Sequence, residues 1–335
     1  MPPAPRLSLV LPVYREAEHL KRSLTEIREI VTELGVPFEI LVIDDGSPDD
    51  TWAILQDLAT GWSELKAFRL SRNFGKEGAL IAGLDASRGD AVIIMDADLQ
   101  HPPSLIPEMY RLWADEGYDV VNAVKRQRGD ESWFRRRLTR LYHRAFEAMV
   151  GVKMVGSSDY KLLARSAVDS YRLFPERNTF FRGLVGWLGL NQADVFFDVA
   201  PRAGGSSSWS LLLLAKLAIN SVVGFTAIPL QAVTVIGVGF LLFAIVIAAQ
   251  TLWAKLSGGA VEGFATVILL QLLIGAILMI GLGIVGQYIA KIFDEVKRRP
   301  RYLIREEVSP RRDLIAPREG PGPAFPELEE RRKIS

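Results

Sequence analysis

The chain has 335 residues, a formal net charge of +1 and no cysteine. The balanced charge argues against a nucleic-acid partner, and the lack of cysteine excludes thiolate metal sites and thiol catalysis. A chain of this length can hold one domain of ordinary size and a further segment. Its first residues lack the apolar stretch of a secretory signal peptide, so we expect the N-terminal part to remain cytoplasmic.

Short apolar runs alternate with helical patterns in the first third of the chain. Strands are predicted at residues 7–13, 39–43, 67–70, 91–95 and 119–124. Apolar residues recur every three or four positions from Leu20 to Val31, and a second helix is predicted from Thr51 to Leu58. This alternation predicts an α/β domain with a mostly parallel sheet, whose ligands lie at the carboxyl ends of the strands.

Two long stretches contain no ionisable Asp, Glu, Lys, Arg or His, from Leu217 to Ala254 and from Gly263 to Ala290. Each is longer than the ~20 apolar residues that cross a bilayer core. We predict transmembrane helices at 229–254 and 264–290, joined as a hairpin by a short connection. The protein is therefore expected to be integral to a membrane.

Basic residues directly after the second span predict its orientation. They are Lys291, Lys297, Arg298, Arg299, Arg301 and Arg305. An excess of Lys and Arg marks the cytoplasmic side, so both chain ends and the large domain are expected there. Residues 291–335 are read as a basic segment and, after Arg305, a mobile tail, because the tail mixes proline with both charge signs.

The region before the spans is expected to meet the membrane surface. We divide the chain into a soluble domain over 1–208 and an amphipathic interfacial region over 209–228. A basic stretch from Lys125 to Arg144 carries aromatic residues between its charges. It is either a solvated helix face or a surface for anionic lipid or phosphate, and the sequence leaves both open.

Paired carboxylates at predicted strand ends carry the chemistry. Asp96 and Asp98 follow the strand at 91–95. Oxygen ligands of this kind favour Mg²⁺ or Mn²⁺, and such an ion would neutralise a diphosphate leaving group. Asp44 and Asp45 follow an earlier strand, where one can bind a ribose or base edge and the other can cap the next helix.

Four segments together resemble the family 2 glycosyltransferases of the GT-A fold, which places a Rossmann-like domain at residues 1–208. They are Leu11–Glu16, Ile43–Ser47, Arg72–Lys76 and Asp96–Pro103. Trp133, Arg177–Gly183, the hairpin and Gly286–Ile289 are similar to the polyprenyl-phosphate branch. That branch includes dolichol-phosphate mannose synthase and the bacterial undecaprenyl-phosphate glucosyl and aminoarabinosyl transferases.

The resemblance implies three sets of site residues. The nucleotide pocket would contain Pro12, Tyr14, Glu16, Asp44, Asp45, Asp96 and Ala97. The metal and diphosphate would be held by Asp96, Asp98 and Gln100. The acceptor phosphate would meet Lys125, Arg136, Arg182, Arg202 and Ser207. Relatives carry Glu and Lys where this chain has Ser206 and Ser208, which removes one expected phosphate contact.

Asp159 matches an acidic residue proposed as the catalytic base in this branch, and Asp98 is the other expected catalytic residue. A phosphate monoester has a second pKa near ~6, so its oxygen is mostly ionised at neutral pH and a base gains little. We therefore favour Asp159 as an organiser of sugar hydroxyls or of its loop. A base and a simple helix cap or turn residue are the alternatives.

The resulting prediction is an inverting transfer of a sugar from a nucleotide diphosphate to a polyprenyl phosphate. UDP-glucose is the expected donor, with N-acetylated or amino sugars as alternatives, and undecaprenyl phosphate is the expected lipid in a bacterium. The main rival is a catalytically inactive scaffold or nucleotide-sugar sensor. A processive polysaccharide synthase and a transporter fit less well. Glycine-rich spans would allow a homo-oligomer.

Overall fold

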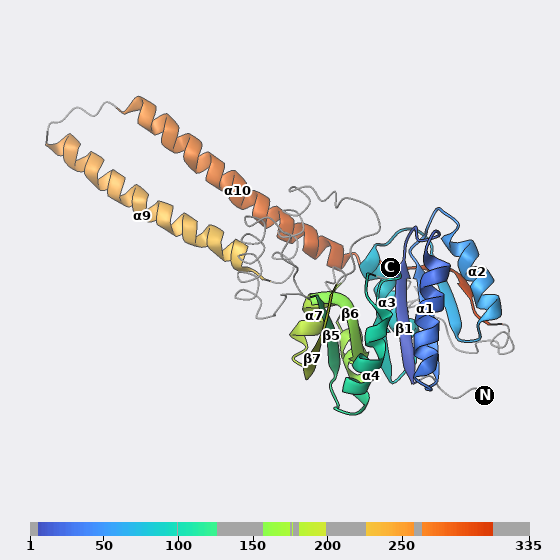
Figure 1. Ribbon diagram of the computed structural model, residues 1–335. Coiled ribbons are helices and arrows are strands. Elements are labelled where there is room, and N and C mark those ends of the chain that lie inside the picture. The colour runs from blue at the N-terminus through green and yellow to red at the C-terminus, as the bar shows by residue number, and fades with distance from the viewer. Residues whose placement is uncertain are drawn as a thin grey trace, which may run out of the picture.

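The computed structural model describes residues 6–98, 100–125, 157–174, 176, 181–198, 226–257 and 263–310. Within them, one sheet has the order β7-β5-β6-β4-β1-β2-β3-β8 (Figure 1). Its strands are β1 (Leu7–Val13), β2 (Phe38–Asp44), β3 (Leu65–Leu70), β4 (Ala91–Ile94), β5 (Val120–Lys125), β6 (Ser157–Ala164), β7 (Gln192–Phe197) and β8 (Ile304–Val308). The five predicted strands are confirmed, with ends that shift by one or two residues.

The predicted parallel arrangement is also confirmed for most of the sheet. β1 pairs in parallel with β2 and β4, and β2 with β3. β6 runs antiparallel between β4 and β5, and β8 is antiparallel to β3. Parallel strands bury both faces, which explains why β1 reads as a continuous apolar run rather than an alternating one.

Helices cover both faces of the sheet. They are α1 (Leu20–Glu33), α2 (Thr51–Gly61), α3 (Lys76–Ala86), the 3-10 turn η1 (Pro103–Leu105), α4 (Ile106–Ala114), α6 (Arg165–Arg172) and α7 (Phe181–Trp187). One apolar cluster joins alternate residues of β1, such as Leu9, to α1, α2 and α4. The other contains Val10 and residues of α3, α6 and α7. The domain is therefore a three-layer α/β structure, as the sequence predicts.

Helix α3 lies unusually close to β1. A Cβ atom built at Gly83 would lie 2.3 Å from Cγ1 of Val10, so glycine permits this approach. Since α3 follows β3 and precedes the parallel strand β4, its N-terminus lies at the carboxyl ends of these strands. This packing fixes where Lys76, the first residue of α3, meets the strand ends.

Strand β8 corrects the prediction of a mobile tail directly after Arg305. Residues 304–308 pair with β3, and the backbone N–H of Ser71 donates to the Leu303 carbonyl at 2.8 Å. The indole N–H of Trp52 also donates to the Glu306 carboxylate at 3.0 Å. The segment is ordered because it completes the hydrogen bonds of what would otherwise be an edge strand. Residues 311–335 lie outside the described residues.

Two long helices, α9 (Ile228–Leu256) and α10 (Phe264–Val296), project from the sheet domain (Figure 1). Both contain stretches long and apolar enough to cross a membrane, with mean hydropathy of 2.7 and 2.1. Their apolar side chains are largely exposed, unlike those of a core helix. The pair therefore fits a membrane hairpin and indicates membrane association. The second helix continues past the predicted end of its span, at residue 290, to Val296.

Two segments are predicted to contact the lipid surface. Most of the interfacial region 209–228 and nearly all of the basic stretch from Lys125 to Arg144 lie outside the described residues. Their roles stay predictions.

Candidate functional site

A pocket of about 360 Å³ opens at the carboxyl ends of β1, β2 and β4. It is lined by Pro12, Val13, Tyr14, Glu16, Asp45, Asn73, Gly75, Lys76, Ala79, Asp96, Ala97 and Asp98. All four segments that carried the family 2 resemblance thus meet in one place. The position is the one expected for ligands of a parallel α/β sheet.

The two acidic residues at the end of β2, Asp44 and Asp45, have different surroundings. Asp44 is fully buried and does not line this pocket. Its Oδ1 accepts the Ser47 N–H at 2.9 Å, and its Oδ2 lies 3.4 Å from Nε of Arg69. The geometry therefore matches the turn interpretation of Asp44, and its predicted contact with the nucleotide stays a prediction. Oδ1 of Asp44 thus helps to shape the β2–α2 turn, whereas the buried Oδ2 accepts no hydrogen bond and has only the Arg69 charge beside it.

Asp45 faces the pocket and holds the loop before α3. Its carboxylate accepts the backbone N–H groups of Phe74, at 2.7 Å, and Gly75, at 2.9 Å. Burial raises the pKa of Asp45, although these two bonds act against the rise. Gly75 has a φ of +86°, which favours glycine, and α3 begins at the next residue. Asp45 thus couples the pocket to the start of α3.

Three carboxylates, Glu16, Asp96 and Asp98, form what we call the acidic wall. Burial raises the pKa of Glu16, and the negative charges of Asp98 and Asp96 raise it further. Asp98 is exposed and its Oδ1 accepts the Gln100 N–H at 3.0 Å. Such a concentration of negative charge fits a cation.

The acidic wall would not hold a metal ion alone. The described part of the chain contains no group of three or more His, Asp or Glu side chains arranged to bind one. Mg²⁺ is typically held by one or two carboxylates, with substrate phosphates and waters as the other ligands. Asp96 and Asp98 fit that pattern.

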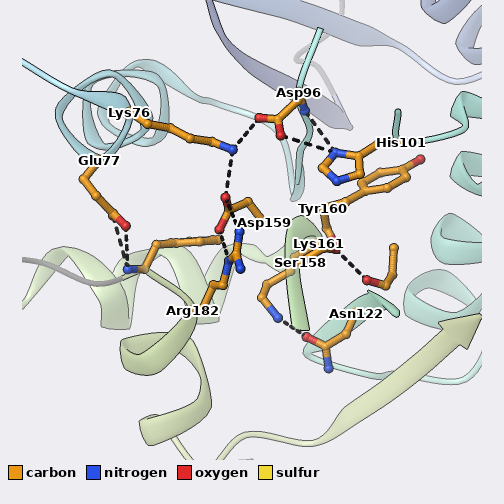
Figure 2. Close-up of polar contacts among 12 residues, drawn as sticks. Lys76, Glu77, Asp96, His101, Asn122, Ser158, Asp159, Tyr160, Lys161 and Arg182 are labelled. Atoms are coloured by element: carbon orange, nitrogen blue, oxygen red, sulfur yellow. Dashed lines mark hydrogen bonds and ion pairs between the residues drawn. The ribbon is translucent and has the colours of Figure 1, made fainter. Parts of the chain in front are cut away.

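Lys76, Asp159 and Arg182 form a charge-paired cluster beside the acidic wall (Figure 2). Nζ of Lys76 lies 2.5 Å from Oδ1 of Asp96 and 2.8 Å from Oδ2 of Asp159. Nε and Nη2 of Arg182 donate to the two Asp159 oxygens at 2.6 and 2.9 Å. The cluster links α3, β6, α7 and the segment after β4.

Asp159 lies within β6, so its interpretation as a helix cap or turn residue is wrong. Burial would raise the pKa of Asp159, but the bond and charge of Arg182, together with Lys76, hold that pKa well below its usual range. A carboxylate with so low a pKa is a weak proton acceptor. The geometry therefore favours a positioning role over that of a base.

Glu77 connects the start of α3 to α7. Its two oxygens each lie 3.2 Å from the Phe181 nitrogen, which donates to them. Burial raises the pKa of Glu77 to about 7; the Phe181 bond opposes this shift and the charge of Asp159 adds to it. The helix that carries Arg182 is thus attached to α3 by a carboxylate that titrates near neutral pH.

His101 supports Asp96 from behind. It is buried and stacked on Tyr160, with ring centroids 5.2 Å apart. Burial lowers its pKa, although the charge of Asp96 opposes the shift. The neutral ring accepts the backbone N–H of Asp96 at 3.4 Å. Sequence reasoning missed the parts played by Lys76, Glu77 and His101, although Lys76 and His101 lay inside the recognised segments.

The predicted acceptor residues are placed only in part. Lys125 ends β5 and is half-buried, whereas Arg182 is committed to Asp159 through two of its nitrogens. Gln100 follows the acidic wall without lining the pocket. Arg136, Arg202 and Ser207 lie outside the described residues.

Comparison with known proteins identifies the class. Residues 8–172 match the family described as Glycosyl transferase family 2. An uncharacterized glycosyltransferase of Synechocystis sp. is 35% identical over 302 residues, which cover 90% of this chain and 95% of that protein. The putative glycosyltransferase CsbB of Bacillus subtilis is 37% identical over 310 residues, which cover 92% and 94%.

A third relative carries a more specific name. The bactoprenol glucosyl transferase of Shigella phage SfII is 34% identical over 304 residues, which cover 90% of this chain and 98% of that protein. The chain belongs to glycosyl transferase family 2, and it is a glycosyltransferase. The family resemblance inferred from the sequence segments is confirmed.

Proposed function

We propose that the protein transfers glucose from UDP-glucose to a polyprenyl phosphate, undecaprenyl phosphate in a bacterial membrane. The observation that carries this proposal is the pocket in which the acidic wall meets the charge-paired cluster, on a chain that continues into two apolar helices. Relatives named as bactoprenol glucosyl transferases support the choice of sugar and lipid.

The donor would occupy the pocket with its nucleoside toward Tyr14 and Asp45 and its diphosphate toward Asp96 and Asp98. Mg²⁺ or Mn²⁺, held by Asp96 and Asp98 with Gln100 beside them, would supply Lewis-acid stabilisation of the leaving diphosphate. The chain's own contribution is to keep these carboxylates in place, through His101 behind Asp96 and the Gln100 N–H on Asp98.

The reaction would be one in-line displacement with inversion. An ionised oxygen of the lipid phosphate attacks the anomeric carbon, and the bond from that carbon to the diphosphate oxygen breaks, so the nucleoside diphosphate leaves with the electron pair. Lys125 and Arg182, with Arg136, Arg202 and Ser207, are the proposed contacts of the acceptor phosphate. Asp159 orients Arg182 and Lys76 and removes no proton.

The proposed topology puts the sheet domain and both chain ends on the cytoplasmic side. The basic residues that follow the second span support this orientation. Residues 209–228 are proposed to lie at the interface and to bring the lipid head group to the pocket, and the domain boundaries given above stay part of the proposal. Close packing of the glycine-bearing spans would favour a homo-oligomer.

A donor panel tests this function. The full chain in detergent receives undecaprenyl phosphate, Mg²⁺ or Mn²⁺, and one of several UDP- and GDP-sugars, and lipid products are measured by mass spectrometry. We expect a hexose added from UDP-glucose, with none formed when a chelator is present. Binding of UDP-glucose without any lipid product from any donor would instead support the scaffold or sensor alternative.

A further inference from the structure

Lys76 is a cation placed inside an anionic pocket, and the displacement described above assigns it no contact with substrate. Its side chain is 40% exposed and lines the pocket. The ammonium group bridges Asp96 and Asp159, which belong to different parts of the site (Figure 2). It therefore neutralises part of the acidic wall in the ligand-free protein.

The position of Lys76 is fixed by the backbone rather than by these ion pairs alone. The loop that precedes it is held by the two N–H bonds to Asp45, and α3 packs closely on β1 at Gly83. The ammonium group at the end of a flexible stem can still move by a few ångströms. A lysine with a fixed backbone and a mobile ammonium group is suited to exchanging partners.

A divalent cation and Lys76 would compete for Asp96. The ammonium group lies at 2.5 Å from Oδ1, within the space that a metal bound to that oxygen would need. The two positive charges would also repel each other strongly at such a separation. Asp159 offers Lys76 a second partner, so loss of the Asp96 contact would not leave the ammonium group unpaired.

We propose that Lys76 takes the cation position of the ligand-free pocket and passes to a substrate phosphate when a divalent cation binds Asp96. An ammonium group has three donors, so the one freed from Asp96 can serve a phosphate oxygen while another stays on Asp159. Metal and nucleotide binding are then coupled, because each favours the displaced position of Lys76. This inference rests on the metal-dependent transfer proposed above.

The test measures binding rather than turnover. Mn²⁺ is titrated into the full chain in detergent, with and without UDP as the nucleotide probe. The electron paramagnetic resonance signal of free Mn²⁺ measures how much remains unbound. Lys76→Met removes the charge and keeps the stem, Lys76→Arg keeps a charge, and Lys21→Met on the exposed surface of α1 is the matched control. Thermal unfolding of each variant confirms that it is folded, and Lys76→Gln replaces any methionine variant that is not.

We expect Lys76→Met to bind Mn²⁺ about tenfold more tightly than wild type without UDP, and to lose about tenfold in the coupling between Mn²⁺ and UDP. Lys76→Arg should resemble wild type in the absence of UDP, and Lys21→Met should match it throughout. Unchanged or weaker Mn²⁺ binding by Lys76→Met would overturn this inference and leave the proposed transfer reaction standing. Wild type that binds no Mn²⁺ even with UDP would overturn the metal-dependent function and this inference with it.

Discussion

The acidic wall and the charge-paired cluster treat their carboxylates in opposite ways. Asp98 is exposed and receives a backbone N–H from Gln100. Asp159 is buried and receives two bonds from Arg182 and one from Lys76. A carboxylate left facing solvent beside other negative charges is available to a ligand, whereas one saturated by cations shapes the site. We therefore expect mutations in the acidic wall to reduce mainly the rate of transfer and mutations in the charge-paired cluster to reduce mainly stability.

The largest effect is expected at Asp98. Asp98→Asn keeps the side-chain shape and removes the charge that would hold the metal and the diphosphate. Transfer to lipid should fall on the order of 10³-fold, because metal stabilisation of the leaving group contributes several kcal/mol. The rate of lipid glycosylation measures it, with Asp57→Asn on the exposed face of α2 as the control. A loss below tenfold would remove Asp98 from the chemistry.

Asp159 should contribute more than Asp98 to the stability of the fold. Asp159→Asn leaves Lys76 and Arg182 without their shared anion, and we expect a loss of about 3 kcal/mol, at the low end for a broken buried pair because both cations are partly exposed. Thermal unfolding measures this loss, and Asp98→Asn should unfold as wild type does. Because the pKa of Asp159 is depressed, its stabilisation persists above pH 5 and disappears only in stronger acid.

Glu77 should make stability depend on pH in the opposite sense. Its pKa is raised to about 7, so the folded state holds a proton that the unfolded chain releases near 4.5. Stability from this group therefore falls as pH rises from about 5 to 7, by on the order of 2 kcal/mol. Glu77→Gln should flatten that part of the profile of unfolding temperature against pH. Equal slopes for both proteins would show that Glu77 does not titrate there.

The smallest effect is expected at β8. Glu306→Ala removes the bond from Trp52 and an ion pair with Arg69, whose Nη1 lies 3.6 Å away. We expect a loss of about 1 kcal/mol in the stability of the sheet domain, the usual net value of such a bond. Glu307→Ala on the exposed neighbour is the control, and both are read by thermal unfolding. No difference between the two would mean that backbone pairing alone holds β8.

The strand-end motifs were predictable because a parallel sheet brings consecutive strand ends to one edge. Asp45, Asp96 and Asp98 converge for that reason. The strands that precede them, β2 and β4, contain continuous apolar runs that the sequence identifies as buried. Asp44 was not assignable, because a turn residue and a pocket residue at a strand end look alike in a sequence. Only its burial and its bond to the Ser47 N–H show that it shapes the turn.

The ion pairs of Asp159 and the strand β8 could not be predicted from the sequence, because both depend on contacts between distant parts of the chain. Arg182 is 23 residues from Asp159, and Lys76 reaches the same carboxylate from α3. Strand β8 has no recognisable apolar run. It is ordered because it pairs with the edge strand β3, where Val308 lies opposite Ala67, 241 positions earlier in the chain. Such contacts depend on the tertiary arrangement and leave no periodic signal.

The most direct test of this division of roles is the rate of transfer by folded Asp159→Asn between pH 5 and 8. With Asp159 as an organiser, the rate should fall by a moderate factor and keep the shape of the wild-type pH profile, because ionisation of the lipid phosphate, near pH ~6, sets its acid limb. Complete loss of transfer in a variant that is still folded at the assay temperature and binds UDP normally would contradict the account and make Asp159 the catalytic base.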